Sequence, residues 1–183
     1  MKLVPTPLAL PGCYSLSLPT FRDDRGSFSK LFHEGGVGEY LPGFLPREIY
    51  LTTSSRGVLR GMHFQLPPND HAKVVVSLSG RVTDVLLDLR PGPGYGAFTS
   101  VELSPHGQNA VLMPKGIAHG FYAHEDNSGI LYLVETVHAP ENDRGVMWNS
   151  FSYDWPTTDP ILSQRDNAHP ILTDFVAPAD WAN

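Results

Sequence analysis

Short apolar segments, each followed by a turn signal at a spacing of about ten residues, dominate the middle of this chain. The segments are rich in aliphatic and β-branched residues, which favour strands. Dipeptides containing glycine, proline, asparagine or serine separate them, and convincing helical periodicity is scarce. We therefore predict strands over the ranges 74–78, 82–89, 99–103, 110–113 and 130–137.

This spacing is typical of a sandwich or barrel of antiparallel strands. The 17 glycines and 17 prolines among 183 residues also favour many turns over long helices. We expect at most one turn of helix within residues 33–41 and a proline-containing C-terminal segment that wraps the surface. No repeat or low-complexity linker divides the sequence, so residues 1–183 are predicted to form a single domain.

Charge and cysteine content exclude several classes of protein. With 13 Lys+Arg against 19 Asp+Glu, the net charge is −6, so no broad basic surface is available for nucleic acid or anionic lipid. The single cysteine, Cys13, rules out an internal disulfide and a multi-cysteine metal site. Prolines interrupt the apolar stretch after Lys2, which therefore suits neither a signal peptide nor a membrane span. We expect a cytoplasmic protein that binds any anion locally.

The first cluster of ionisable residues contains Arg60 and His63 on either side of Gly61, followed by Lys73. In a regular strand Arg60 and His63 would face opposite sides, unless Gly61 permits a bulge that turns one of them. Lys73 opens an apolar strand, where an ammonium group is easily desolvated and its pKa lowered. The alternative is that His63 is a core histidine and both cations are solvated charges at a sheet edge.

Two further clusters carry ionisable groups. A predicted turn places His119 beside Gly120, which leaves room for a ligand, although His119 could also simply cap a hairpin. Tyr132 lies in the middle of an apolar segment, where tyrosine usually packs in the core with its hydroxyl at the edge. The segment Leu162-Ser-x-x-Asp166 taken alone also fits a helix cap or an Asx turn.

Several common catalytic motifs are absent from the sequence. His63 and His119 could in principle bind a metal, but neither H-x-H nor H-E-x-x-H occurs, so we expect no metal. There is no phosphate-binding loop of the P-loop or Rossmann type and no G-x-S-x-G nucleophile elbow. Among the common kinds of catalysis, acid–base chemistry without a cofactor is therefore the one that the sequence favours.

The clusters belong to a longer ordered set of motifs. These are Phe21-x-Asp-x-Arg25-Gly-x-Phe28, Gly57-Val-Leu-Arg60-Gly-Met-His63-Phe-Gln65, Lys73, Asp84-Val-x-x-Asp88-Leu-Arg90, Pro114-x-Gly-x-Ala-His119-Gly-Phe121, Tyr132, Gly145-x-x-Trp148 and Leu162-Ser-x-x-Asp166. Between Phe21 and about Pro170 the chain resembles the dTDP-4-dehydrorhamnose 3,5-epimerase family of the cupin superfamily. The resemblance implies an all-β cupin-type double-stranded β-helix, or jelly roll, with few short helices. The usual metal-binding histidine pair of the first cupin motif is missing, as in a metal-free member.

The resemblance also implies catalytic roles. His63 would be the general base, held by Asp166, and Tyr132 the acid on the opposite face of the sugar ring. Lys73 would stabilise the enolate, because the charge released from a C–H next to a ketone moves onto the carbonyl oxygen. Inversion needs two groups that flank the ring, and the pKa of histidine near neutrality suits proton abstraction.

Substrate binding is implied for a larger set: Arg25, Lys30, Glu48, Tyr50, Arg60, His119, His138, Asp143 and Arg165. Among these, Lys30 replaces a glutamate common in the family, and Glu48-Ile49-Tyr50 replaces a Gln-x-Asn. In the family these positions surround the nucleotide base and ribose, partly from the neighbouring subunit. His138 stands where a tyrosine is common near the sugar. These differences leave open which base is bound and whether C3, C5 or both are inverted.

We therefore predict a homodimeric, cofactor-independent epimerase of a nucleotide-diphosphate-linked 4-keto-6-deoxyhexose, in the synthesis of a surface polysaccharide or glycosylated metabolite. One alternative is a single-site 3- or 5-epimerase, or a ketoisomerase, acting on a non-thymidine nucleotide sugar. Others are a metal-dependent cupin oxygenase, which would use His63 and His119 as ligands, and a non-catalytic module that binds sugar nucleotides.

Overall fold

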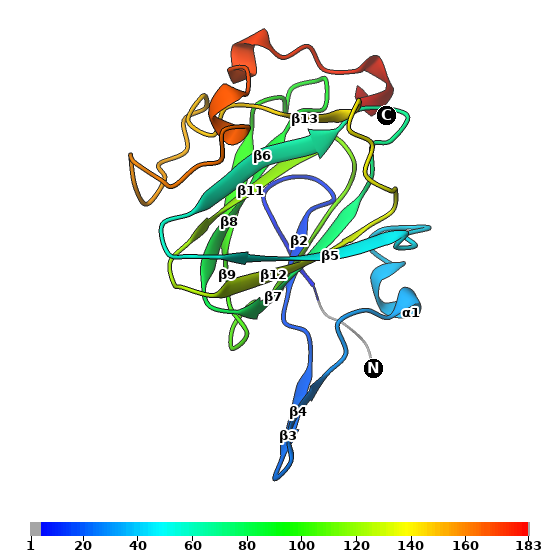
Figure 1. The fold of residues 1–183 in the computed structure, drawn as a ribbon. Helices are drawn as coiled ribbons and strands as arrows, with labels where there is room; N and C mark the ends of the chain where they lie inside the picture. Colours follow the sequence, from blue (N-terminus) through cyan, green and yellow to red (C-terminus); the bar gives the residue numbers. More distant parts are fainter. Residues whose placement is uncertain (1–4, 183) are drawn as a thin grey trace.

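The computed structural model describes residues 5–182, whose body consists of two antiparallel sheets packed face to face (Figure 1). The six-stranded sheet has the order β1 (Thr6–Pro7), β2 (Tyr14–Leu16), β10 (Ala110–Met113), β7 (Lys73–Ser79), β12 (Ser128–Val134) and β5 (Glu48–Ser54). The five-stranded sheet has the order β13 (Asp143–Gly145), β6 (Leu59–Gln65), β11 (Ile117–Ala123), β8 (Val82–Asp88) and β9 (Phe98–Leu103). The predicted all-β sandwich is confirmed.

Helical structure is limited to short pieces. The helix α1 (Glu34–Val37) falls within the range 33–41 where a single turn is expected. Three 3-10 helices, η1 (Asp166–Ala168), η2 (Leu172–Asp174) and η3 (Ala179–Ala182), lie in the C-terminal segment. Among residues 5–182, no helix has the length and apolar character that crossing a membrane requires.

The main core lies between the two sheets. Val75, Val111 and Ile130 of the six-stranded sheet pack there with Leu86 and Phe121 of the five-stranded sheet, and all five are fully buried. Burial of this apolar surface between the layers provides the main driving force for folding.

Each sheet is also covered on its outer face. Val37, Leu41 and Phe44, in and after α1, pack on the six-stranded sheet. Trp155 and Trp181, in the C-terminal segment, belong to the cluster that includes Leu59 and Val85 of the five-stranded sheet. Strands buried on both faces carry continuous apolar sequence rather than alternation, which explains why residues 74–78 could be recognised as a strand.

The predicted strand over 130–137 extends too far, because β12 ends at Val134. Beyond that point Glu135 accepts a hydrogen bond from the backbone N–H of Ala72 at 2.9 Å, and Thr136 lies 2.6 Å from Nδ1 of His71. These polar side chains bind the loop before β7 instead of continuing the ladder.

One hairpin leaves the body. The strands β3 (Thr20–Asp23) and β4 (Gly26–Ser29) pair only with each other among the described residues, and Figure 1 shows them projecting away from the sandwich. Phe21 and Phe28 on this hairpin are 56% and 61% exposed. The hairpin therefore presents apolar side chains with little covering from its own chain.

Candidate active site

A β-bulge in β6 brings the first cluster together. His63 pairs with His119, whereas Arg60 pairs with Phe121. Between these two pairs β6 therefore contains one residue more than β11. Gly61, at φ +143°, permits this bulge because it has no Cβ. A Cβ at this position would lie only 2.5 Å from the Cα of Gly120. As a result, Arg60 and His63 line the same cavity, and the predicted bulge is confirmed.

The cavity has a volume of about 340 Å³ and draws residues from both sheets. It brings together most of the predicted site residues: Glu48, Tyr50, Arg60, His63, Lys73, His119, Tyr132, His138, Asp143 and Arg165. Six lining residues were not identified from the sequence: Thr52, Phe64, Gln65, His71, Val134 and Thr136. Phe64 and Gln65 belong to the first motif but were given no role there, and the other four carry no motif and reach the cavity only through the folding of strands and loops.

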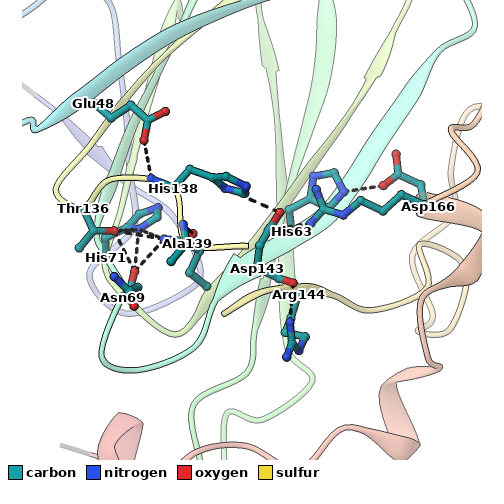
Figure 2. Close-up of polar contacts among 12 residues, drawn as sticks. Glu48, His63, Asn69, His71, Thr136, His138, Ala139, Asp143, Arg144 and Asp166 are labelled. Carbon is teal, nitrogen blue, oxygen red and sulfur yellow. Dashed lines mark hydrogen bonds and ion pairs between the residues drawn. The ribbon is translucent and has the colours of Figure 1, made fainter. Parts of the chain in front are cut away.

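His63 on β6 is paired with Asp166 of η1, and Figure 2 shows the two side chains facing each other. Nε2 of His63 lies 2.5 Å from Oδ1 of Asp166, which is 3% exposed. An ionised carboxylate only accepts hydrogen bonds, so Nε2 carries the proton and Nδ1 is left as the basic nitrogen. Burial lowers the pKa of His63, and the Asp166 carboxylate opposes this effect.

Lys73 is the buried cation of the cavity. Its side chain begins at the first residue of β7, and its Nζ donates a hydrogen bond to the backbone oxygen of His63 at 3.1 Å. Burial lowers the pKa of Lys73 to about 8, although the carboxylates of Asp143 and Asp84 oppose the shift. The ammonium group is thus charged at neutral pH and close to titrating, as the sequence predicts.

Tyr132 enters the cavity from β12, in the sheet opposite His63. Its ring stacks on Tyr50 with centroids 4.6 Å apart and meets His119 edge-on at 5.9 Å. Burial raises the pKa of Tyr132 far above its usual value, so the phenol is protonated and can donate. His119 is fixed in turn by Asp84, with 2.6 Å between Nε2 and Oδ2.

The more exposed side of the cavity carries a chain of polar contacts, which Figure 2 shows in part. Glu48 of β5 accepts a hydrogen bond from the backbone N–H of His138 at 2.6 Å. Asp143 lies 3.9 Å from Nδ1 of His138 and 2.7 Å from Nη2 of Arg165. The half-exposed side chains of His138 and Arg165 remain accessible to a ligand.

Arg25 and Lys30 are not brought to the cavity of their own chain. Arg25 lies in the turn of the β3–β4 hairpin, where its side chain is 89% exposed and pairs with Asp23 at 2.6 Å. Lys30 follows β4 and is also exposed. Within one chain, these two residues therefore stand apart from the other predicted site residues.

A histidine base and a tyrosine acid on opposing sheets, with an ammonium group beside them, are the groups needed to move a proton on a carbon next to a carbonyl. The fold and the cavity thus define a β-sandwich protein whose cavity gathers groups suited to acid–base chemistry. A family model described as dTDP-4-dehydrorhamnose 3,5-epimerase matches residues 7–174. The chain belongs to this family, a group of carbohydrate epimerases with a cupin-like fold, which confirms the predicted cupin-type architecture and reaction class.

Individual relatives agree with this assignment. The dTDP-4-dehydrorhamnose 3,5-epimerase of Mycobacterium tuberculosis H37Rv is 36% identical over 178 residues, covering 93% of this chain and 88% of its own length. The dTDP-4-dehydrorhamnose 3-epimerase of Streptomyces niveus is 34% identical over 172 residues, covering 92% and 83%. The crystal structure of NovW, a 4-keto-6-deoxy sugar epimerase of Streptomyces spheroides, superimposes with a TM-score of 0.88 at 33% identity, covering 95% of this chain and 89% of NovW.

Proposed function

We propose that this protein inverts both C3 and C5 of a dTDP-linked 4-keto-6-deoxyhexose, as a single-domain enzyme that needs no cofactor. The observation that carries the proposal is the entry of His63 and Tyr132 into one cavity from opposite sheets, with Lys73 bonded to the backbone of His63. Groups on two sides of a sugar ring can remove a proton from one face and deliver another to the opposite face.

The chemistry follows from these positions. Nδ1 of His63 takes the proton from the carbon next to the C4 carbonyl. The electrons of that C–H bond form a double bond to C4, and the π electrons of the carbonyl move onto its oxygen. The Lys73 ammonium stabilises the resulting enolate. Tyr132 then donates its phenolic proton to the opposite face, which inverts the carbon. The proton on His63 leaves to solvent and Tyr132 regains one, so solvent hydrogen enters the product.

Binding of the diphosphate is assigned to local cations, because the chain as a whole is acidic. The cavity is lined by His119 and by Arg60, whose side chain donates a hydrogen bond to Ser54 Oγ at 3.0 Å. Both side chains can bind such an anion. Arg165 and its ion-pair partner Asp143 are assigned to ligand-facing positions of the same cavity. The base and ribose are assigned to Glu48 and Tyr50, and His138 to the neighbourhood of the sugar.

We also propose that the active form is a cytoplasmic homodimer in which the β3–β4 hairpin of each subunit reaches the cavity of its partner. Support comes from the exposed apolar residues of the edge strand β5, where Ile49 and Leu51 are 58% and 56% exposed. The exposed hairpin would cover such a surface and bring Arg25 and Lys30 to the site. A single, buried cysteine suits a reducing compartment.

The test is to convert dTDP-4-keto-6-deoxyglucose in heavy water and analyse the product by mass spectrometry and NMR. Inversion at both carbons should leave deuterium at both C3 and C5. Deuterium at one carbon only would contradict double epimerisation and favour the second candidate, a single-site epimerase. The similarity to a 3-epimerase and the histidine at position 138 favour that candidate. Binding without any exchange would instead indicate a non-catalytic module.

A further inference from the structure

Asp166 faces a second histidine besides His63. Nε2 of His169 lies 3.5 Å from Oδ1 of Asp166, the same oxygen that His63 contacts at 2.5 Å. The two imidazole rings are 5.5 Å apart and nearly perpendicular, at 73°. One carboxylate oxygen thus serves two imidazole nitrogens that come from different parts of the chain, β6 and the residue after η1.

The ring of His169 is held in place by close packing on β13. Its side chain is only 10% exposed. A Cβ at Gly145 would come 2.6 Å from Cδ2 and 2.7 Å from Cε1 of His169, so only glycine at this position leaves room for the ring. Gly145 pairs in register with His63, which ties the position of His169 to the strand that carries the base.

The inward nitrogen of His169 has no alternative partner in the part of the chain that the structure describes. Nε2 is buried and makes no hydrogen bond of regular geometry. A buried polar group without a partner destabilises the folded state. The carboxylate of Asp166, at ion-pair distance, is the group that can compensate this cost.

We propose that His169 is a positioning residue for the epimerase reaction: it donates Nε2–H to Oδ1 of Asp166, fixes the carboxylate against His63 and limits how basic His63 becomes. This inference rests on the proposed role of His63 as the base. Nothing in the sequence motifs points to it, because His169 follows the Leu162-Ser-x-x-Asp166 segment in a stretch without regular periodicity.

The charges around Asp166 and His63 support this role of His169. Burial by itself would raise the pKa of Asp166, but the nearby imidazole of His169 and the hydrogen bond with His63, with a contribution from Ser163, hold it well below its usual range. Asp166 is therefore a carboxylate at neutral pH. The charged groups that act on His63 are Asp166, Arg165 and Lys73. Removing His169 leaves the carboxylate to His63 alone, which should raise the pKa of His63.

A metal site is the competing interpretation, since His63, Asp166 and His169 present ligand atoms within 4.8 Å of one another. A zinc ion about 2.0–2.2 Å from each nitrogen and oxygen ligand would keep those atoms roughly 3 Å or more apart. The 2.5 Å between His63 Nε2 and Asp166 Oδ1 is too short for two ligands of one zinc ion and is that of a direct hydrogen bond. The geometry therefore favours positioning over metal binding.

The first test compares His169→Ala with His169→Gln, which retains an N–H donor, and with His106→Ala as a control at an exposed histidine. We expect His169→Ala to lower kcat about tenfold, equivalent to ~1.4 kcal/mol, with little change in KM. The acid limb of the kcat/KM profile should move up by about half a pH unit. His169→Gln should recover most of the rate and His106→Ala should behave as wild type. A wild-type rate and profile in His169→Ala, or a defect confined to KM, would overturn the inference.

The second test does not depend on activity. The imidazole of His63 is titrated by NMR in the substrate-free wild type, in His169→Ala and in His169→Gln. An upward shift of the His63 pKa in His169→Ala supports the inference even if the wild type fails to epimerise any 4-keto sugar, in which case only the proposed function fails. An unchanged pKa overturns the inference. If His169→Ala does not fold, His169→Leu, which fills the space but lacks the N–H donor, replaces it: a raised His63 pKa supports the inference and an unchanged one overturns it. One equivalent of Zn²⁺ retained on dialysis by wild type but not by His169→Gln would assign His169 to a metal site instead.

Discussion

At the residue scale, the proposed chemistry depends on two side chains, His63 and Tyr132, whose pKa values are shifted mainly by burial. Tyr132 is 7% exposed and retains its proton at neutral pH, while His63 is oriented by Asp166 so that one ring nitrogen stays free. Because the two residues lie on different sheets, substitution can separate proton removal from proton delivery.

Tyr132→Phe should uncouple exchange from inversion. The substitution removes the phenolic O–H but keeps the ring that stacks on Tyr50. We expect solvent deuterium to enter recovered substrate, because His63 still works, whereas inversion slows by roughly 10²–10⁴-fold. Tyr40→Phe, in the outer cluster on the six-stranded sheet, is the matched control. Inversion at the normal rate in Tyr132→Phe would assign the acid to another residue.

Lys73 predicts a basic limb in the pH profile. Burial lowers its pKa to about 8, and only the protonated ammonium can stabilise an enolate, so kcat should fall as the pH rises through about 8. In Lys73→Arg the cation persists at high pH and this limb should disappear, even if the rate is reduced. Lys115→Arg, at a half-exposed lysine outside the cavity, should keep the wild-type profile. A kcat that stays flat up to pH ~10 would show that titration of Lys73 is not involved.

At the scale of single elements, the bulge in β6 is the feature that builds the site. It depends on the close approach of Gly61 and Gly120, and it places Arg60 and His63 on one cavity. Adding a single methyl group at this bulge should therefore disturb the fold more than adding one at an exposed position.

Gly61→Ala should reduce both stability and activity. Its Cβ would meet the backbone of Gly120, and its φ of +143° disfavours a side chain. We expect a loss of about 2–4 kcal/mol of unfolding free energy, together with reduced kcat. Gly92→Ala has a similar φ of +136° in open space, so it should cost only about 1 kcal/mol and leave kcat unchanged. Equal effects of the two variants in urea unfolding would mean that the close approach is unimportant.

The elements also show what the sequence can predict. The strands over 74–78, 82–89 and 110–113 were recognisable because layers on both faces make them predominantly apolar. β5 and the β3–β4 hairpin were not, because their exposed residues lack the pattern of strands buried within one chain. In the cavity, motif residues such as His63 and Tyr132 could be named in advance. His169 could not, since its role depends on the space above Gly145, which only the folded chain reveals.

At the scale of the whole molecule, the site of one chain is incomplete if Arg25 and Lys30 bind substrate. Both belong to the projecting hairpin region and lie outside the cavity of their own subunit. A symmetric dimer that exchanges hairpins would complete two sites at once.

Mixing subunits tests this arrangement. His63→Ala and Arg25→Ala homodimers should each be impaired, the first in proton removal and the second in substrate binding. After subunit exchange, a mixed dimer contains one site with both substitutions and one with neither, so activity should recover to about one quarter of wild type. The matched control mixes His63→Ala with Tyr132→Phe, which lie in the cavity of the same chain, so every site of the mixed dimer keeps one substitution and activity should not recover. A mixture of His63→Ala and Arg25→Ala that stays at the average of its parents would place Arg25 outside the partner's site.

The central claim is that His63 removes the proton while a separate set of residues holds the nucleotide. The most direct test measures solvent deuterium exchange into dTDP-4-keto-6-deoxyglucose and dTDP affinity side by side in wild type, His63→Ala and Arg60→Ala. We predict that His63→Ala loses exchange by at least about 10²–10⁴-fold with nearly unchanged affinity, and that Arg60→Ala mainly weakens binding. Exchange at the wild-type rate in His63→Ala would contradict the account.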